Sequence, residues 1–230
     1  MSLSEELTER LAYKISFYIP LGDLQIPVPQ STVITWGVMA FLVIGSILFT
    51  RNLQVVPKGP QAVIESLIEL LQKLYAENLG ERGRKYIPYL VTVVLYLGVS
   101  NTLGLFGITP PTKDLNVTAG LALMSILLVI FAGIRERGFV GWLKHFAYPS
   151  KLIIFMNILE IGIRPLSLCM RLFGNILGAY IIMELIIFAA PAVVPLVASA
   201  YFDIFDGLLQ AYIFTFLTSI FIGEAVEEEE

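Results

Sequence analysis

The sequence predicts an all-α integral membrane protein with five membrane-embedded helices and one amphipathic surface helix, in which the last two long helices form a tilted hairpin. Of the 230 residues, 57% are hydrophobic and the mean hydropathy is +0.79, so the chain has more apolar surface than one soluble core can bury. Charged residues make up only 15% and cluster between long uncharged stretches. Such stretches suit lipid, because a hydrocarbon core of roughly 30 Å needs about 20 helical residues to satisfy every backbone group.

The predicted elements form a single membrane domain over residues 1–230. An N-terminal segment, residues 1–30, is expected outside the membrane. The membrane helices that we expect are residues 31–50, 86–106, 115–134, 153–190 and 195–223. Asp114 and Asn116 stand at the start of the third helix as its expected caps. A short joint containing two prolines separates the last two helices, so they should pair as an antiparallel hairpin.

The fourth predicted helix is too long to stand upright in a bilayer. Residues 153–190 number 38, which at 1.5 Å per residue is about 57 Å, nearly twice the hydrocarbon thickness. We therefore expect the hairpin to be steeply tilted or partly emergent. A tilted hairpin presents a long surface to a neighbouring membrane object and does not enclose a pore alone.

Residues 61–78 have the pattern of an amphipathic helix. Leucine and valine recur at helical spacing, while charged residues occupy other faces; the apolar set is Val63, Leu67, Leu70, Leu71 and Leu74, and the charged set is Glu65, Glu69, Lys73 and Glu77. Such a helix lies on the membrane surface or packs on a soluble partner. The alternative is a cytoplasmic helix that serves only as a spacer.

Lysine and arginine predict the orientation. Six lie between Arg51 and Lys85 and four between Arg135 and Lys151, against three on the opposite side. By the positive-inside rule, the N-terminus is outside and the C-terminus is cytoplasmic. The acidic first thirty residues resemble neither a signal peptide nor a transit peptide, which favours a bacterial plasma membrane.

Composition also argues against several kinds of site. The chain has one cysteine, Cys169, and one histidine, His145, so we expect no disulfide, no metal site and no cofactor. The net charge of −4 comes from a few clusters, and we expect no nucleic-acid partner.

The fourth predicted helix carries a polar stripe. Six residues fall within about 40° of Arg171 at 100° per residue; they are Asn157, Glu160, Arg164, Ser167, Arg171 and Asn175. A charged side chain in mid-membrane costs about 3 kcal/mol on insertion scales and normally marks an ion path or a partner charge.

The two arginines have different expected partners. Glu160 lies one turn before Arg164, so Arg164 either closes an internal ion pair or reaches the headgroups, or it belongs to the ion path. Arg171 has no acid three or four residues away on either side. Its counter-charge should therefore come from another helix or another chain.

The fifth predicted helix carries a stripe of opposite sign. Ser199, Asp203, Asp206 and Gln210 follow spacings of four, three and four, which predicts one face with two carboxylates and an amide. Glu184, one turn after Tyr180, lies roughly opposite the Arg171 stripe. Acids on both sides of a fixed cation suggest an aqueous route whose middle is blocked by positive charge.

The arginine stripe closely resembles a known signature. Residues 164–175, Arg-Pro-Leu-Ser-Leu-Cys-Met-Arg-Leu-Phe-Gly-Asn, are similar to the RPLSLxLRLFGN motif of subunit a of F-type rotary ATP synthases. Further matches follow in the same order as in that family, at residues 57–61, 101–105, 111–118 and 209–214. The last but one includes Asp114 and Asn116.

The resemblance implies a stator subunit with no catalytic site of its own, which carries protons or sodium ions through two half-channels to and from a ring of small hairpin c subunits. Its partners would be that ring, the peripheral stalk subunit b and the lipid bilayer. Arg171 would face the ring carboxylate, with Asn175 and Gln210 beside it and Asp203 in the access channel. Where the family often has an acid or histidine, this chain has Tyr180, and Glu184 could take that role.

Two other functions compete with this interpretation. A secondary transporter could bind an anionic substrate with the two arginines, but it predicts an internal repeat, and none is visible in the sequence. An intramembrane enzyme would need a catalytic dyad or metal set beside the stripe, which the sequence does not offer.

Overall fold

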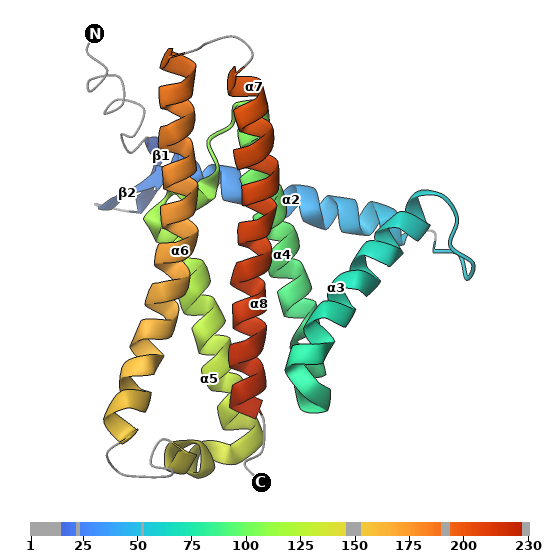
Figure 1. Cartoon of the computed structure of the whole chain (residues 1–230), viewed down its shortest axis with the longest axis vertical. Helices are drawn as coiled ribbons and strands as arrows, with labels where there is room; N and C mark the ends of the chain where they lie inside the picture. The colour runs from blue at the N-terminus through green and yellow to red at the C-terminus, as the bar shows by residue number, and fades with distance from the viewer. Residues whose placement is uncertain (1–14, 22–23, 52, 146–152, 190–193, 227–230) are drawn as a thin grey trace.

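Long helices dominate the chain. A computed structural model describes residues 15–21, 24–51, 53–145, 153–189 and 194–226. Within these ranges, five helical stretches have the length and composition to cross a membrane, as predicted. Figure 1 shows α6 (Ile153–Ala189) and α8 (Gly207–Val226) running antiparallel along the long axis, with α5 (Leu115–His145) packed against both.

The remaining helices lie to one side of the long pair. α4 (Ile87–Thr102) packs on α8, and α3 (Pro60–Gly83) packs on both α4 and α8. α2 (Gln30–Thr50) runs across the direction of α6 and α8 and leaves the bundle (Figure 1). Val38 is the one buried residue of α2. The apolar side chains on its other faces are largely exposed, as expected of a helix that contacts lipid.

The helices do not coincide with all the predicted membrane spans. α5 continues past residue 134, and the helical path breaks at Gly138, which has a φ of 70° that glycine adopts without strain. The second span is built of three pieces, since the 3₁₀ turns η1 (Arg84–Tyr86) and η2 (Leu103–Phe106) flank α4. The expected joint between the last two helices falls mostly outside the described residues. After it come α7 (Val194–Ser199) and η4 (Ala200–Asp206).

An antiparallel β-hairpin precedes the first membrane helix, where the sequence predicted only an external segment. β1 (Ile15–Leu21) pairs with β2 (Leu24–Pro29), with Ile19 opposite Ile26. Residues 1–14 of the predicted segment lie outside the described residues. The sequence does not predict this strand, because β2 contains two prolines, Pro27 and Pro29, and proline usually argues against a strand except at a sheet edge.

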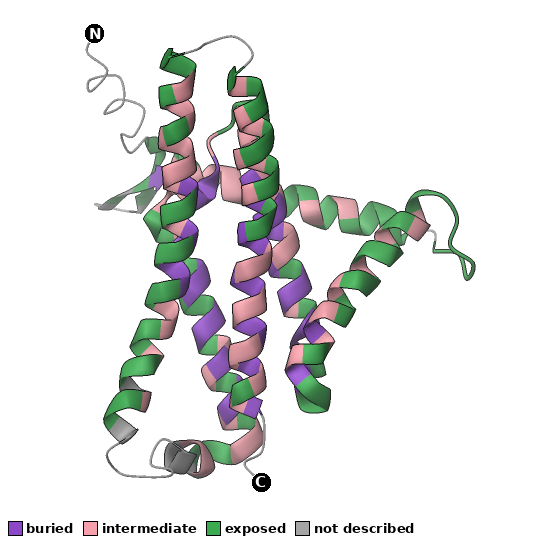
Figure 2. Ribbon diagram, in the orientation of Figure 1, coloured by how far each residue is buried: buried purple, intermediate pink, exposed green. Residues whose placement is uncertain are grey.

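The core lies where α4, α5, α6 and α8 meet. One buried cluster includes Leu97, Leu172 and Phe214, and a second, which also involves α3, includes Tyr75 and Ile222. Figure 2 shows buried residues along these contacts and exposed residues on the outer faces. Apolar outer faces are expected of a chain whose solvent is lipid.

The face of α3 that packs on the bundle differs from the apolar face expected from the sequence. Val63, Leu67 and Leu70 are exposed, whereas Tyr75 and Leu79 are buried against α4 and α8. The Tyr75 and Thr215 hydroxyls lie 2.7 Å apart, and the carbonyl oxygen of Asn78 leaves no room for a Cβ on Gly223. The second half of α3 is therefore part of the core, and only its first half has an unburied apolar side.

Candidate functional site

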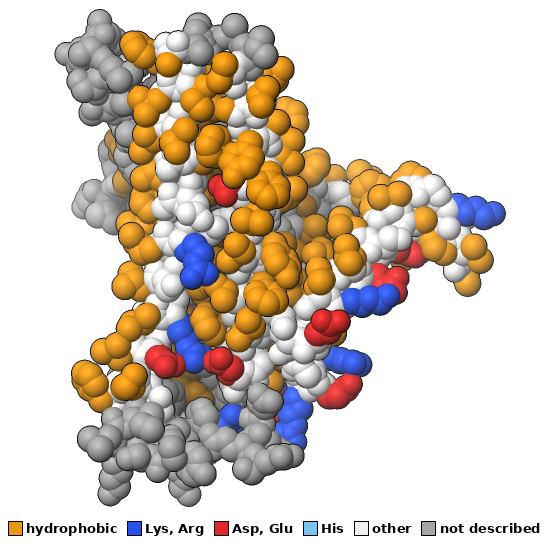
Figure 3. Space-filling model, viewed as in Figure 1, with side chains coloured by type: hydrophobic (Ala, Val, Ile, Leu, Met, Phe, Trp, Pro, Cys, Tyr) orange, Lys and Arg blue, Asp and Glu red, His pale blue; other side chains and the backbone are white. Residues whose placement is uncertain are grey.

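Arg171 lies in the middle of α6 with an exposed side chain. Leu168 and Leu172 turn inward and are buried, while Met170 is exposed beside the arginine. Within the part of the chain that the structure describes, Arg171 makes no hydrogen bond and no ion pair. Figure 3 shows basic side chains over α6 interrupting an otherwise apolar surface. The guanidinium is thus presented outward from a largely apolar helix.

One turn beyond Arg171, the two long helices are joined by a hydrogen bond. The Asn175 amide donates to Oε1 of Gln210 on α8, 2.7 Å away. Gln210 is 1% exposed, and its Nε2 has no partner among the described residues. The family resemblance implied that these two amides lie beside the arginine, and their hydrogen bond joins α6 to α8.

Arg164 closes the ion pair expected with Glu160, at 2.9 Å. It makes a second ion pair of 2.9 Å with Glu224 near the end of α8, and its guanidinium lies 4.7 Å from the centre of the Phe221 ring. No local pattern indicated Glu224 as a partner, because it lies sixty residues further along the chain. Arg164 therefore ties α6 to α8 on the other side of Arg171 from Asn175.

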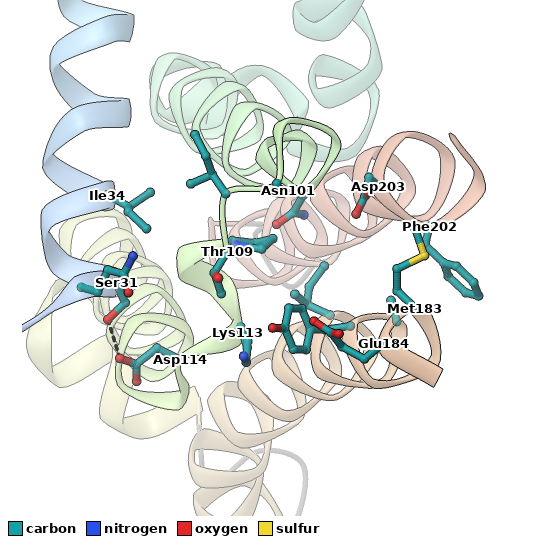
Figure 4. Close-up of a pocket in the computed structure, with 18 of the residues that line it drawn as sticks. Ser31, Ile34, Asn101, Thr109, Lys113, Asp114, Met183, Glu184, Phe202 and Asp203 are labelled. Atoms are coloured by element: carbon teal, nitrogen blue, oxygen red, sulfur yellow. Dashed lines mark hydrogen bonds between the residues drawn. The ribbon is translucent and has the colours of Figure 1, made fainter. Parts of the chain in front are cut away.

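A cavity of about 700 Å³ lies beyond Arg171 and is lined by residues of α6, of η4, of the start of α2 and of the segment between α4 and α5. Its lining includes four of the predicted site residues: Asp114, Tyr180, Glu184 and Asp203. Figure 4 shows Glu184 from α6 and Asp203 from η4 turned toward the same space as Lys113 from the 3₁₀ turn η3 (Pro111–Lys113). The fold therefore brings Glu184 and Asp203 to one cavity, on the same side of Arg171.

Several contacts orient the groups around this cavity. The Lys113 ammonium lies 3.6 Å from the centre of the Tyr180 ring. Ser199 donates to Asp203 at 2.6 Å, and Ser31 donates to Asp114 at 2.5 Å (Figure 4). Asp114 also accepts from the backbone of Asn116, so it caps α5 as expected. The sequence offered no signal for Ser31 or Lys113 as cavity residues.

The other predicted residues do not join the cavity. Asn116 donates its amide to Asp114 at 3.1 Å but does not line the space. Asp206 is half-buried and lies outside the lining, although the sequence placed it on one face with Asp203. Ser167 is exposed on α6 near Arg171, and Asn157 and Glu160 continue the stripe toward the start of that helix.

The separation of Asp203 from Asp206 has a structural cause. Both lie in η4, a π-helical segment in which the Gly207 N–H donates to the Phe202 carbonyl five residues earlier. The wider turn rotates Asp206 away from Asp203, so a constant 100° per residue gives the wrong face. Short π-helical segments of this kind frequently occur at functional sites.

Polar groups lie on both sides of Arg171 along α6. The cavity with Glu184 and Asp203 lies on one side, and Ser167, Arg164 and Glu160 continue the stripe on the other. The arginine stands between them without a partner of its own in the described chain. A fixed positive charge therefore lies between two groups of carboxylates, and its field repels cations near it.

Comparison with known proteins identifies the family. The family model described as ATP synthase A chain matches residues 32–223. A relative named ATP synthase subunit a, sodium ion specific, from Propionigenium modestum is 34% identical, over 94% of this chain and 86% of its own. ATP synthase subunit a of Moorella thermoacetica is 35% identical over 87% of this chain and 92% of its own.

A further relative, ATP synthase subunit a 2 of a Bradyrhizobium species, is 36% identical over 97% of this chain and 96% of its own. The matched region covers all five helices of membrane length in the described chain. It leaves out only residues 30–31 at the start of the first helix and residues 224–226 at the end of the last. The protein is thus a multi-pass membrane protein, and it belongs to the ATP synthase A chain family.

Proposed function

We propose that this chain is the stator ion-channel subunit of an F-type ATP synthase, and that ion flow past it drives rotation and ATP synthesis. It carries protons or sodium ions through two half-channels to and from a ring of small hairpin subunits, within a complex that also includes the peripheral stalk subunit b. The observation that carries the proposal is the exposed Arg171 guanidinium on an apolar helix, without a partner in the described chain.

An unpaired cation in a membrane requires a counter-charge. The cost of about 3 kcal/mol or more is offset if a carboxylate on a neighbouring subunit faces the guanidinium. An opposite charge favours the ionised form of that carboxylate, so a loaded ring site releases its ion on reaching Arg171. Because a guanidinium does not give up its proton, it cannot relay the ion itself. Arg171 would then pair with the ring carboxylate and also block direct ion flow between the two half-channels.

The cavity fits the outer half-channel. It is lined by Glu184, Tyr180 and Asp203, and the loop that closes it carries Lys113, which the distribution of basic residues assigns to the outside. Glu184 offers the carboxylate that Tyr180 lacks at the position where the family often has an acid or histidine. We propose that ions enter here and pass Asp203 and Glu184 to the ring.

The inner half-channel would follow the polar stripe from Arg171 toward the start of α6. Ser167 is exposed, and the carboxylates of Glu160 and Glu224 are each about half exposed around Arg164. These groups offer hydrogen-bond partners along a helix that otherwise exposes apolar side chains to lipid. The two routes reach the ring at different points because Arg171 separates them.

The arrangement of α2 supports a tilted hairpin. With 21 apolar-rich residues, α2 spans about 31 Å, which matches the bilayer core when it stands upright. α6 runs across the direction of α2, and its 37 residues span about 56 Å. We propose that α6 and α8 lie steeply inclined in the membrane, so that their exposed apolar side and Arg171 face a long stretch of the ring's surface.

The proposal is tested by purifying the chain from its native membrane and reconstituting it into sealed vesicles. We expect it to co-purify with a ring of small hairpin subunits and to translocate ions only when the ring is present. Uptake of an anionic substrate by the chain alone would contradict the proposal and favour a secondary transporter.

The coupling ion is decided by the same vesicles. A relative of 34% identity is named as sodium ion specific, while others of similar identity carry no such name, so similarity alone leaves both ions open. Proton coupling predicts ATP synthesis without added sodium that a protonophore alone collapses. Sodium coupling predicts synthesis that needs sodium and withstands the protonophore.

A further inference from the structure

The π segment η4 packs against a small set of residues to which the proposed ion route assigns no role. Asn101 at the end of α4 is 2% exposed, and its amide donates to the carbonyl of Gly207 at 2.9 Å. Gly207 is the residue at which η4 gives way to α8. Asn101 thus holds the backbone at the point where the wide turn ends.

The Asn101 amide is itself oriented by a second buried group. Thr112, fully buried in η3, donates its hydroxyl to Oδ1 of Asn101 at 2.8 Å. This contact fixes which end of the amide faces the threonine, so the Nδ2 end is left to face Gly207. The chain Thr112, Asn101, Gly207 therefore joins the loop beside the cavity to the start of α8.

Two glycines make the close approach possible. A Cβ on Gly207 would lie 3.0 Å from Cβ of Asn101, which is tighter than an ordinary contact. A Cβ on Gly104, in η2, would overlap the carboxylate of Asp203. Asp203 is therefore held between Ser199, which donates to it, and the bare backbone of Gly104.

We infer that Asn101, Thr112 and Gly104 are positioning residues for Asp203, which act by fixing the π segment so that this carboxylate points into the cavity. The inference rests on the proposed function of the cavity as the outer half-channel. It gives a structural role to the motifs at residues 101–105 and 111–118, which are far from Asp203 in the sequence but line the same cavity. Without this support, the turn could relax toward an ordinary α-helix, and Asp203 would rotate out of the cavity.

The test measures the accessibility of position 203 in the assembled complex. Asp203→Cys is combined with Cys169→Ala in a complex without other cysteines, and labelling by a membrane-impermeant thiol reagent added outside is timed. Adding Thr112→Val keeps the side-chain shape but removes the hydroxyl; loss of one buried hydrogen bond, about 1 kcal/mol, predicts labelling about fivefold slower. Adding Thr112→Ser keeps the hydroxyl and should restore the parent rate.

The outcomes separate the two claims. Equal labelling with valine and serine, or slower labelling with serine than with valine, would overturn the positioning role, because packing and not the hydroxyl would then matter. If Asp203→Cys is not labelled from outside even with Thr112 intact, the proposed outer half-channel fails instead.

A second pair of variants tests Gly104 in the same assay. Gly104→Ala should displace the side chain at position 203 and slow its labelling at least about fivefold. Gly98→Ala in α4, the helix that precedes η2, is the control, because its Cβ would make an ordinary 3.4 Å contact with Leu208. Similar labelling rates for both alanine variants would argue against a positioning role of Gly104 for residue 203.

Discussion

Arg171→Ala is expected to abolish ion-coupled ATP synthesis in sealed vesicles and to open a passive leak. The alanine variant has no cation to stabilise an ionised ring carboxylate, so the ring no longer releases its ion at the boundary between the half-channels. It also has no fixed positive charge between the cavity and the polar stripe, so ions can pass directly. Both effects are measured in one preparation, as ATP formed and as decay of the ion gradient.

The matched control replaces an arginine that lies outside the proposed ion route. Arg84 is exposed in η1 and pairs with Glu81 at 2.9 Å, outside the proposed route. Exposed pairs of this kind contribute about 0 to 1 kcal/mol, so Arg84→Ala should leave synthesis and leak near the parent values. Normal coupled synthesis by Arg171→Ala would end the proposed mechanism.

Glu184→Gln is expected to slow ion translocation at least about tenfold, because it removes a carboxylate that exchanges ions with the cavity. Tyr180→Phe removes only a hydroxyl from the same lining and should have a smaller effect. Both variants keep the size and shape of the side chain, so packing around the cavity is preserved. The rate of ion flux driven by a fixed membrane potential compares them.

The order of the two effects decides which residue carries the ion. A larger loss in Tyr180→Phe than in Glu184→Gln would remove Glu184 from the channel. The proposed route would then pass through Asp203 and the Tyr180 hydroxyl instead.

Much of the fold was predictable because lipid imposes simple rules. The length of α2 and the ends of α6 follow from counting apolar residues, and helical spacing alone predicted the Glu160–Arg164 pair. The polar stripe was visible for the same reason, since α6 is a continuous helix from Ile153 to Ala189. Periodicity works wherever the helix is regular.

What the sequence missed depends on tertiary contacts or on irregular backbone. Glu224 reaches Arg164 only because α8 returns antiparallel to α6, and Lys113 reaches Tyr180 only because η3 folds over the cavity. Asp206 was assigned to the wrong face because η4 is a π segment, which leaves no mark in residue spacing. These are contacts between distant segments, which no local pattern encodes.

The central claim is that Arg171 faces the ion-binding carboxylate of a passing ring subunit. It is tested by placing cysteine at Ser167, exposed one turn before Arg171, and pairing it with single cysteines near the ring carboxylate. Leu127→Cys, 63% exposed on α5, is the control. The account predicts a disulfide from position 167 and none from position 127; no cross-link from 167, with a cross-link from 127, would contradict it.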